Sequence, residues 1–265
     1  DGPGGGPVSH RIHSTVLIDP SAELGADVEI GPFAIIGPNV EIGSGSRIAA
    51  RATLECNVRL GEGVHVGSGS ILGGPPQDLK FGGEETWVEI GDGTIIREYA
   101  TVNRGTTASG VTSVGRECFI MTYVHLAHDC HLGDGVIIAN GTQLAGHVTI
   151  EDRAILSGLV AVHQFVKIGA HAFVGGATRV NQDVPPFVKA VGNPVELYGL
   201  NSIGLNRYGM PSTTIAALKR AYRMFFNSDL NLGQALERAR SELPDLPEVA
   251  HFIEFVSSSQ RGVPA

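Results

Sequence analysis

The sequence predicts a mainly β protein, a parallel β-helix of hexapeptide repeats followed by a small α-helical domain. Aliphatic residues recur at every sixth position from Ile18 to Val180, and they fill 25 of these 28 positions. Because only 42% of the chain is hydrophobic, chance would fill fewer than half of them. A period of six fits neither an amphipathic helix nor a strand with one buried face. It is typical of the coils of a parallel β-helix.

Two further features of the repeat support this fold. The fourth residue after each aliphatic one is small or β-branched, and we expect both sets to point inward. Glycine often follows the aliphatic residue, as at Gly25, Gly61 and Gly133, and we expect it to supply the positive φ that corners need. Three hexapeptides make one coil of 18 residues. The small positions include Val28, Ala34, Val40, Val124, Cys130, Val136, Val148, Ala154 and Val160.

The pattern divides the chain into three parts. Residues 1–15 begin with a Gly- and Pro-rich stretch and predict a disordered lead-in, and residues 16–195 form the β-helix. Residues 196–265 form the helical domain, with a short helix around 197–205 and three longer ones. The apolar stripes of the three longer helices contain Ile215, Leu218, Ala221, Tyr222, Phe225 and Phe226, then Leu232, Ala235, Leu236 and Ala239, then Val249, Phe252, Ile253 and Val256.

Two breaks interrupt the repeat without changing its phase. Residues 73–87 read GGPPQDLKFGGEETW, and residues 103–113 read NRGTTASGVTS. A loop that leaves a solenoid usually lies on its working face, so we assign the first break to function. We interpret the second break as a tolerated insertion.

Composition excludes several classes of protein. The formal net charge of −8 argues against a nucleic-acid surface. No run of about 18 apolar residues is present, so we expect no insertion into a membrane. Three cysteines do not make a disulfide framework, and Cys118 and Cys130 occupy the inward small position. We expect buried thiols in a reducing compartment.

Histidines gather on one edge when the sequence is wound on an 18-residue coil. Four of the ten fall in neighbouring columns of three successive coils, and His128 shares its column with Gly146 and Gln164. An imidazole can act as a general base near neutral pH or as a metal ligand, so this edge is the candidate site. The four are His125, His128, His147 and His163.

Five short motifs, in this order, resemble the UDP-N-acetylglucosamine 3-O-acyltransferase family. The resemblance covers the chain after Val16, including the helical tail. It implies a left-handed parallel β-helix, a cytoplasmic homotrimer with its sites between subunits, and no metal or cofactor. The implied reaction moves a 3-hydroxyacyl chain from acyl carrier protein to UDP-N-acetylglucosamine, as the first step of lipid A biosynthesis. The motifs are PQDLK (76–80), HLAHDC (125–130), LAGHV (144–148), AVHQF (161–165) and QDVPPF (182–187).

The resemblance also implies residue roles. His128 is the general base, Asp129 orients it and stabilises its imidazolium, and the Gly146 N–H stabilises the oxyanion. Neighbouring strand residues point to opposite faces, so pairing His128 with Asp129 requires a corner between them. Gly176 sets the acyl length and leaves room for a long chain. The substrate-binding positions are Asp78, Lys80, His125, His147, His163, Gln164, Asn201 and Arg207.

Two positions depart from the family pattern at the uridine end of the site. Ile203 stands where better-known members carry a glutamate, and Tyr208 stands where they often have a second basic residue. The sequence leaves open the acyl length and whether the acceptor sugar carries a 3-hydroxyl or a 3-amino group.

Three other functions compete with this interpretation. The related N-acyltransferase of the same pathway has an additional N-terminal domain, for which a repeat beginning at Ile18 leaves no room. A zinc carbonic anhydrase on the same helix needs three converging ligands, and His131 is expected to lie too far round to join His125 and His128. A repeat scaffold that only binds a partner leaves the polar edge unexplained.

Overall fold

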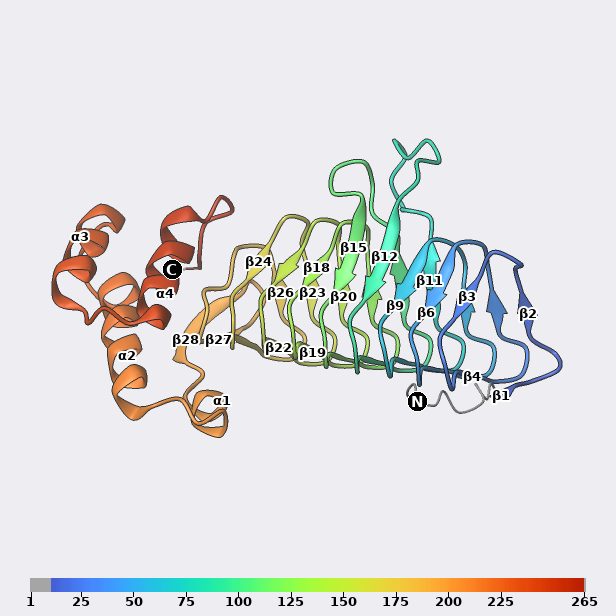
Figure 1. Cartoon of the computed structure of the whole chain (residues 1–265). Coiled ribbons are helices and arrows are strands. Elements are labelled where there is room, and N and C mark those ends of the chain that lie inside the picture. Colours follow the sequence, from blue (N-terminus) through green and yellow to red (C-terminus); the bar gives the residue numbers. More distant parts are fainter. Residues whose placement is uncertain (1–10, 265) are drawn as a thin grey trace, which may run out of the picture.

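A computed structural model describes residues 11–264, which form a left-handed parallel β-helix with a helical domain at its C-terminal end (Figure 1). Most of the predicted lead-in, residues 1–10, lies outside the described residues. Strand β1 already occupies Arg11–Ile12, so the first coil begins before the expected boundary at residue 16.

The strands of residues 11–264 stack into three sheets, one on each face of the prism. The first sheet contains β1 (Arg11–Ile12), β4 (Glu29–Ile30), β7 (Arg47–Ile48), β10 (His65–Val66), β13 (Ile95–Ile96), β16 (Phe119–Ile120), β19 (Ile137–Ile138), β22 (Ile155–Leu156), β25 (Phe173–Val174), β27 (Val188–Val191) and β28 (Glu196–Leu200). The second contains β2 (Leu17–Ile18), β5 (Ile35–Ile36), β8 (Thr53–Leu54), β11 (Ile71–Gly74), β14 (Thr101–Asn103), β17 (His125–Leu126), β20 (Gln143–Leu144), β23 (Ala161–Val162) and β26 (Arg179–Val180). The third contains β3 (Glu23–Leu24), β6 (Val40–Ile42), β9 (Val58–Leu60), β12 (Trp87–Ile90), β15 (Val111–Val114), β18 (His131–Leu132), β21 (Thr149–Ile150) and β24 (Lys167–Ile168).

The core is the stacked interior of the prism, as the repeat predicted. The strands of neighbouring coils are parallel and their inward residues are paired, so that Ile36 pairs with Leu54 and Leu126 pairs with Leu144. The inward aliphatic positions from Ile30 to Val180 are buried, and so are the small positions between them. Each buried aliphatic side chain stabilises the fold by about 1.5–3 kcal/mol. A single coil cannot bury its interior alone, so the coils stabilise one another.

The corners correct one expectation about glycine. Positive φ occurs two residues after the predicted glycine position, often at non-glycine residues such as Asn39 and Tyr123. The predicted glycines are needed because the next coil comes close. A Cβ on Gly37 would lie 1.7 Å from the carbonyl oxygen of Glu55, and one on Gly61 would lie 2.2 Å from the carboxylate of Asp92.

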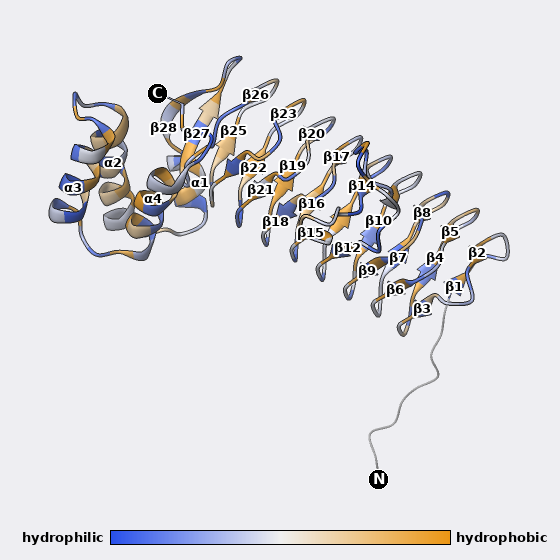
Figure 2. Ribbon diagram, turned by 90° about the horizontal axis from the view of Figure 1, so that it is seen from above, coloured by the Kyte–Doolittle hydropathy of each residue, from blue (hydrophilic) through white to orange (hydrophobic). Residues whose placement is uncertain are grey.

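The helical domain contains α1 (Ser202–Arg207), α2 (Ser212–Phe226), α3 (Leu232–Glu242) and α4 (Pro247–Ser258). Phe252 is fully buried at its centre, and its ring lies 5.8 Å from that of Phe225 and 6.3 Å from that of Phe226. The helices gather beyond the last coils of the prism (Figure 2). No helix of the described chain is long and apolar enough to cross a membrane.

The short helix predicted around 197–205 is wrong over its first part. Residues Glu196–Leu200 form β28, which pairs antiparallel with β27, and α1 begins only at Ser202. An open sheet edge presents unpaired N–H and C=O groups. Strand β28 covers this edge at the end of the first sheet.

Two loops rise from the edge between the second and third sheets (Figure 1). Residues 75–86 connect β11 with β12, and residues 104–110 connect β14 with β15. The turn from β17 to β18, which contains His128 and Asp129, lies on the same edge. The loops and the histidine edge therefore belong to one region of the prism.

Candidate active site

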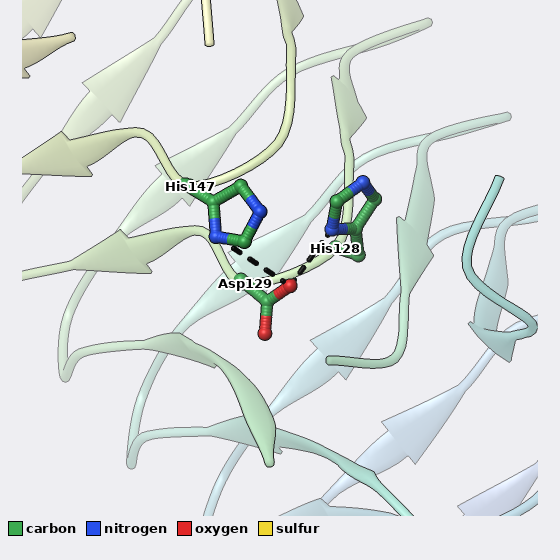
Figure 3. Close-up of side chains that lie close together, drawn as sticks. All are labelled: His128, Asp129 and His147. Carbon is green, nitrogen blue, oxygen red and sulfur yellow. Dashed lines mark hydrogen bonds and ion pairs between the residues drawn. The ribbon is translucent and has the colours of Figure 1, made fainter. Parts of the chain in front are cut away.

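His128 and Asp129 form a hydrogen-bonded pair at the corner between β17 and β18. Asp129 has a φ of 59°, in the left-handed region that aspartate tolerates better than most residues. This turn brings the two neighbouring side chains together, with 2.7 Å between His128 Nδ1 and Asp129 Oδ2 (Figure 3). The corner expected from the sequence is present. The side chain of His128 is 14% exposed, and its Nε2 has no hydrogen-bond partner among residues 11–264.

The Asp129 carboxylate is buried and accepts four hydrogen bonds. Oδ1 accepts from the Thr106 backbone N–H at 2.9 Å and from the Ser109 hydroxyl. Oδ2 accepts from the Thr106 hydroxyl at 2.8 Å and from His128. Burial acts to raise the pKa of Asp129, but the hydrogen bonds from Ser109, His128 and Thr106 outweigh it and hold the pKa well below its usual range. The group is therefore an anion at neutral pH.

The second loop is part of the site, so its interpretation as a tolerated insertion is wrong. Thr106 and Ser109 lie on this loop and contact Asp129 directly. Sequence reasoning missed both residues, because hydroxyl side chains in a loop carry no periodic signal. One signal in the sequence could have found them. The six-residue repeat keeps its phase across the loop, so the chain leaves and re-enters the prism at the same corner.

His147 lies one coil further along and faces the same carboxylate. Its Nδ1 is 3.6 Å from Asp129 Oδ2, and its ring meets the His128 ring edge to face at 5.0 Å (Figure 3). The ring of Phe165 stacks on it at 4.4 Å. Burial lowers the pKa of His147, against the opposing effect of the Asp129 charge. This favours a neutral imidazole beside the pair.

Gly146 lies directly against the His128 ring, as the shared column predicted. A Cβ at this position would lie 2.6 Å from His128 Cε1. No acceptor in the described part of the chain takes the Gly146 N–H. At another edge of the prism, the corresponding N–H groups of Glu62 and Arg116 donate to aspartate side chains of the next coil at 2.8 Å. The Gly146 N–H is thus free to bind a ligand oxygen.

A groove of about 520 Å³ lies over the second sheet beside this corner. His125 lies on β17 and has its Nδ1 2.7 Å from the Thr101 hydroxyl. Burial, followed by the charge of His128, lowers the pKa of His125. The polar residues that line the groove are Gln77, His125, His128, Gln143, His163, Gln164 and Arg179.

The first loop reaches the same region. Gln77 lines the groove, next to Asp78 in the sequence. The Asp78 carboxylate accepts the backbone N–H of Lys80 at 3.0 Å. Its negative charge acts to raise the pKa of His147. Lys80 itself is exposed.

Three of the predicted site residues, Asn201, Arg207 and Gly176, lie on parts of the fold away from the corner that contains His128. The Asn201 side chain caps α1 by accepting the Gly204 N–H, and it donates to the His171 carbonyl at 3.0 Å. Arg207 is exposed at the end of the same helix, with Ile203 and Tyr208 also on the surface. Gly176 is exposed at the edge between the first and second sheets.

One group of residues in the described chain could present several ligand atoms to a metal ion. These are His128, Asp129 and His147, whose ligand atoms lie within 4.8 Å of one another. Each Asp129 oxygen already accepts two hydrogen bonds, which occupy its lone pairs. The arrangement therefore suits a proton held between His128 and Asp129. His131 is not in the group, because it lies on β18 of the third sheet with its Nδ1 2.9 Å from the Ser113 hydroxyl. The three ligands of the zinc alternative, His125, His128 and His131, therefore do not converge in the part of the chain that the structure describes.

Two family models match parts of the chain. Residues 183–264 match the model described as UDP-N-acetylglucosamine O-acyltransferase, domain 2. Residues 9–44, 21–56 and 112–146 match the bacterial transferase hexapeptide model.

Comparison with known proteins finds relatives over most of the chain. An acyl-[acyl-carrier-protein]–UDP-N-acetylglucosamine O-acyltransferase of Alkalilimnicola ehrlichii is 49% identical, covering 96% of this chain and 98% of the relative. One from Thermodesulfovibrio yellowstonii is 47% identical, covering 96% and 99%. A solved UDP-N-acetylglucosamine acyltransferase from Bacteroides fragilis superposes with a TM-score of 0.94 at 40% identity, covering 96% of this chain and 99% of the other.

Proposed function

We propose, because this chain belongs to the UDP-N-acetylglucosamine O-acyltransferase family, that it transfers a 3-hydroxyacyl chain from acyl carrier protein to the 3-position of UDP-N-acetylglucosamine. This reaction is the first step of lipid A biosynthesis. One observation carries the proposal beyond the likeness: a histidine held by a buried carboxylate lies beside a backbone N–H that has no acceptor in the described chain. These are the two elements that acyl transfer from a thioester requires.

His128 is the general base in this proposal. Its Nδ1 donates to Asp129, which leaves the Nε2 lone pair free to take the proton from the 3-hydroxyl of the sugar. The sugar oxygen forms a bond to the thioester carbon, and the carbonyl oxygen becomes an oxyanion. The Gly146 N–H donates to that oxyanion. The carbon–sulfur bond then breaks, and the leaving thiolate takes the proton back from the imidazolium.

The groove would hold the sugar and the acyl chain. His125, His163 and Gln164 line it beside His128, and Asp78 and Lys80 lie on the loop above it. We assign the nucleotide sugar to these side chains. Gly176, which is exposed at the edge of the second sheet, would set the acyl length, because the lack of a side chain there leaves room for a long chain.

An acyl-transfer assay tests the proposal and resolves what the sequence left open. Acyl carrier protein carrying 3-hydroxyacyl chains of several lengths is mixed with UDP-N-acetylglucosamine or with its 3-amino analogue, and the products are weighed by mass spectrometry. We expect a UDP-sugar heavier by one hydroxyacyl group, and the preferred mass gives the chain length. If no acylated UDP-sugar forms with either acceptor, the proposed function is wrong.

A homotrimer with sites between subunits explains the distant positions of Asn201 and Arg207, which would reach the groove of a neighbour. The outward face of the first sheet supports this assembly, because apolar residues continue along its strands from β13 to β25. One residue of this stripe is exposed and the others are half-buried, and contiguous apolar patches on a surface mark interfaces. The stripe contains Ile95, Phe119, Ile137, Ile155 and Phe173.

The trimer is tested at the centre of this stripe. Replacing Ile137 with Glu places a charge in the apolar contact, so we expect dissociation to monomers and loss of activity. Thr149→Glu on the polar third sheet is the matched control and should leave the mass unchanged. Light scattering coupled to gel filtration measures both. A wild-type protein that is monomeric and fully active at working concentrations would contradict the trimer.

Acyl carrier protein is acidic, and basic residues on the tail and the adjacent edge are its candidate contacts. Lys219, Arg220 and Arg223 are exposed on α2, and Arg179 is exposed on β26. We expect Lys219→Glu with Arg220→Glu to raise the KM for the acyl donor by about tenfold at low salt, with a smaller effect at high salt. Arg51→Glu, on an exposed corner near the other end of the prism, is the control. An unchanged KM and salt dependence in the double variant would exclude this patch.

We also propose a cytoplasmic location. All three cysteines are free, with Cys118 and Cys130 buried in the prism as the sequence predicted. Free thiols fit a reducing compartment.

A further inference from the structure

The loop of residues 104–110 has a role that the mechanism above does not use. We propose that Thr106 and Ser109 on this loop are positioning residues, which hold the Asp129 carboxylate in one orientation toward Nδ1 of His128. The inference rests on the proposed function, because it concerns the same general base.

The hydrogen bonds show how the loop fixes the carboxylate. An ionised carboxylate has about four lone-pair sites. Thr106 and Ser109 fill three of them, through the Thr106 N–H, the Thr106 hydroxyl and the Ser109 hydroxyl. The fourth faces His128 at 2.7 Å. The Ser109 hydroxyl also lies 2.9 Å from the Val111 carbonyl, but a charged acceptor binds a hydroxyl proton more strongly.

The loop exists because the chain is longer at this coil. Paired residues are 18 apart from His125 to Gln143 but 24 apart from Thr101 to His125, so six additional residues form the loop beside Asp129. The loop is tied down by backbone bonds. The Gly110 N–H donates to the Thr106 carbonyl at 2.7 Å, and the Trp87 N–H donates to the Gly110 carbonyl at 2.9 Å. The hydroxyls are therefore presented by a fixed loop.

Without these donors, Asp129 would be a poor partner for a base. The residue is 1% exposed, so water cannot replace the lost bonds, and burial then favours the protonated form. The titratable groups that face the carboxylate are His128 and His147. The negative charge of Asp78, on the first loop, acts to raise the pKa of His147. A carboxylate that rotates or takes a proton no longer holds the His128 proton on Nδ1.

The test removes the hydroxyls and keeps the shape of the loop. The variants are Thr106→Val, Ser109→Ala and the double variant, with Thr107→Val as the matched control because that side chain is exposed on the same loop. We expect kcat to fall by about tenfold for each single variant and further for the double, with little change in KM for either substrate. In the double variant, burial is no longer offset by these hydrogen bonds, so it raises the pKa of Asp129. On lowering the pH, the double variant should therefore lose activity at a higher pH than wild type. Thr106→Ser and Ser109→Thr restore a hydroxyl and should recover most of the rate.

A second measurement does not depend on turnover. The ¹⁵N spectrum of His128 in the free protein reports which ring nitrogen carries the proton. We expect Nδ1–H in wild type and in Thr107→Val, and a mixture of tautomers in the double variant. If the double variant retains the wild-type tautomer, kcat and acid limb, the positioning role is wrong. If wild type shows no acyl transfer while the tautomer shifts as expected, the proposed function fails and the positioning role stands.

Discussion

Replacing His128 with Ala should lower kcat by about 10²–10⁴-fold, the usual contribution of general-base catalysis. A sugar hydroxyl is a poor nucleophile at neutral pH, whereas the thioester is already activated, so the base is the group that the reaction lacks. Michaelis constants should change less, because Asp78, Lys80, His125 and Gln164 share the binding of the sugar. The side chain lies in the groove and outside the core, so the prism should keep its thermal stability.

His131→Ala is the matched control for this change. His131 lies three residues further along, on the third sheet, and bonds to Ser113 outside the groove. Its replacement should leave kcat near the wild-type value. His125→Ala should instead raise the KM for the sugar more than it lowers kcat. Equal losses of kcat in His128→Ala and His131→Ala would indicate general disruption of the corner and contradict the assignment of the base.

Replacing Asp129 with Asn should lower kcat by about 10³–10⁴-fold, as expected when the partner that orients a catalytic histidine loses its charge. The amide keeps the size of the carboxylate, but only its oxygen accepts hydrogen bonds. One of the two oxygens that now accept from Thr106, Ser109 and His128 becomes an NH₂ group facing donors. The imidazolium also loses the negative charge that stabilises it during the reaction.

Asp152→Asn is the matched control, because it makes the same substitution at an aspartate on another corner of the prism. The Asp152 carboxylate accepts the Asp134 N–H at 2.9 Å on another edge of the prism, and it does not line the groove. Steady-state kinetics and thermal unfolding of both variants separate the two effects. Asp129→Asn with wild-type kcat and normal folding would show that the carboxylate does not act through His128.

The fold was predictable because one physical rule repeats along the chain. Every sixth residue from Ile30 to Val180, apart from the two loops, is an Ile, Leu or Val that points inward. This repeat therefore predicts both the prism and the residues of its core. The 18-residue coil also predicted that Gly146 lies directly against His128, one coil further along. Outward side chains on a regular coil have few conformations, so the column of a residue determines its neighbours.

The remaining features depend on contacts that no period records. The hydroxyls of Thr106 and Ser109 reach Asp129 because a loop folds back on the corner, and nothing in the residues 103–113 specifies that path. The role of the corner glycines was misjudged because the distance to the next coil, not φ, excludes a side chain there. The sequence predicts a helix where strand β28 lies, because nothing in residues 196–200 shows that an open sheet edge is present to pair with.

The pH–rate profile of wild type and His128→Ala tests the central claim most directly. A general base acts only in its unprotonated form, so wild type should lose activity on the acid side as this base takes up a proton. The small residual rate of His128→Ala should lack that acid limb. If the limb survives in the variant, the base lies elsewhere in the groove, and His147 or His163 would have to take the role that we assign to His128.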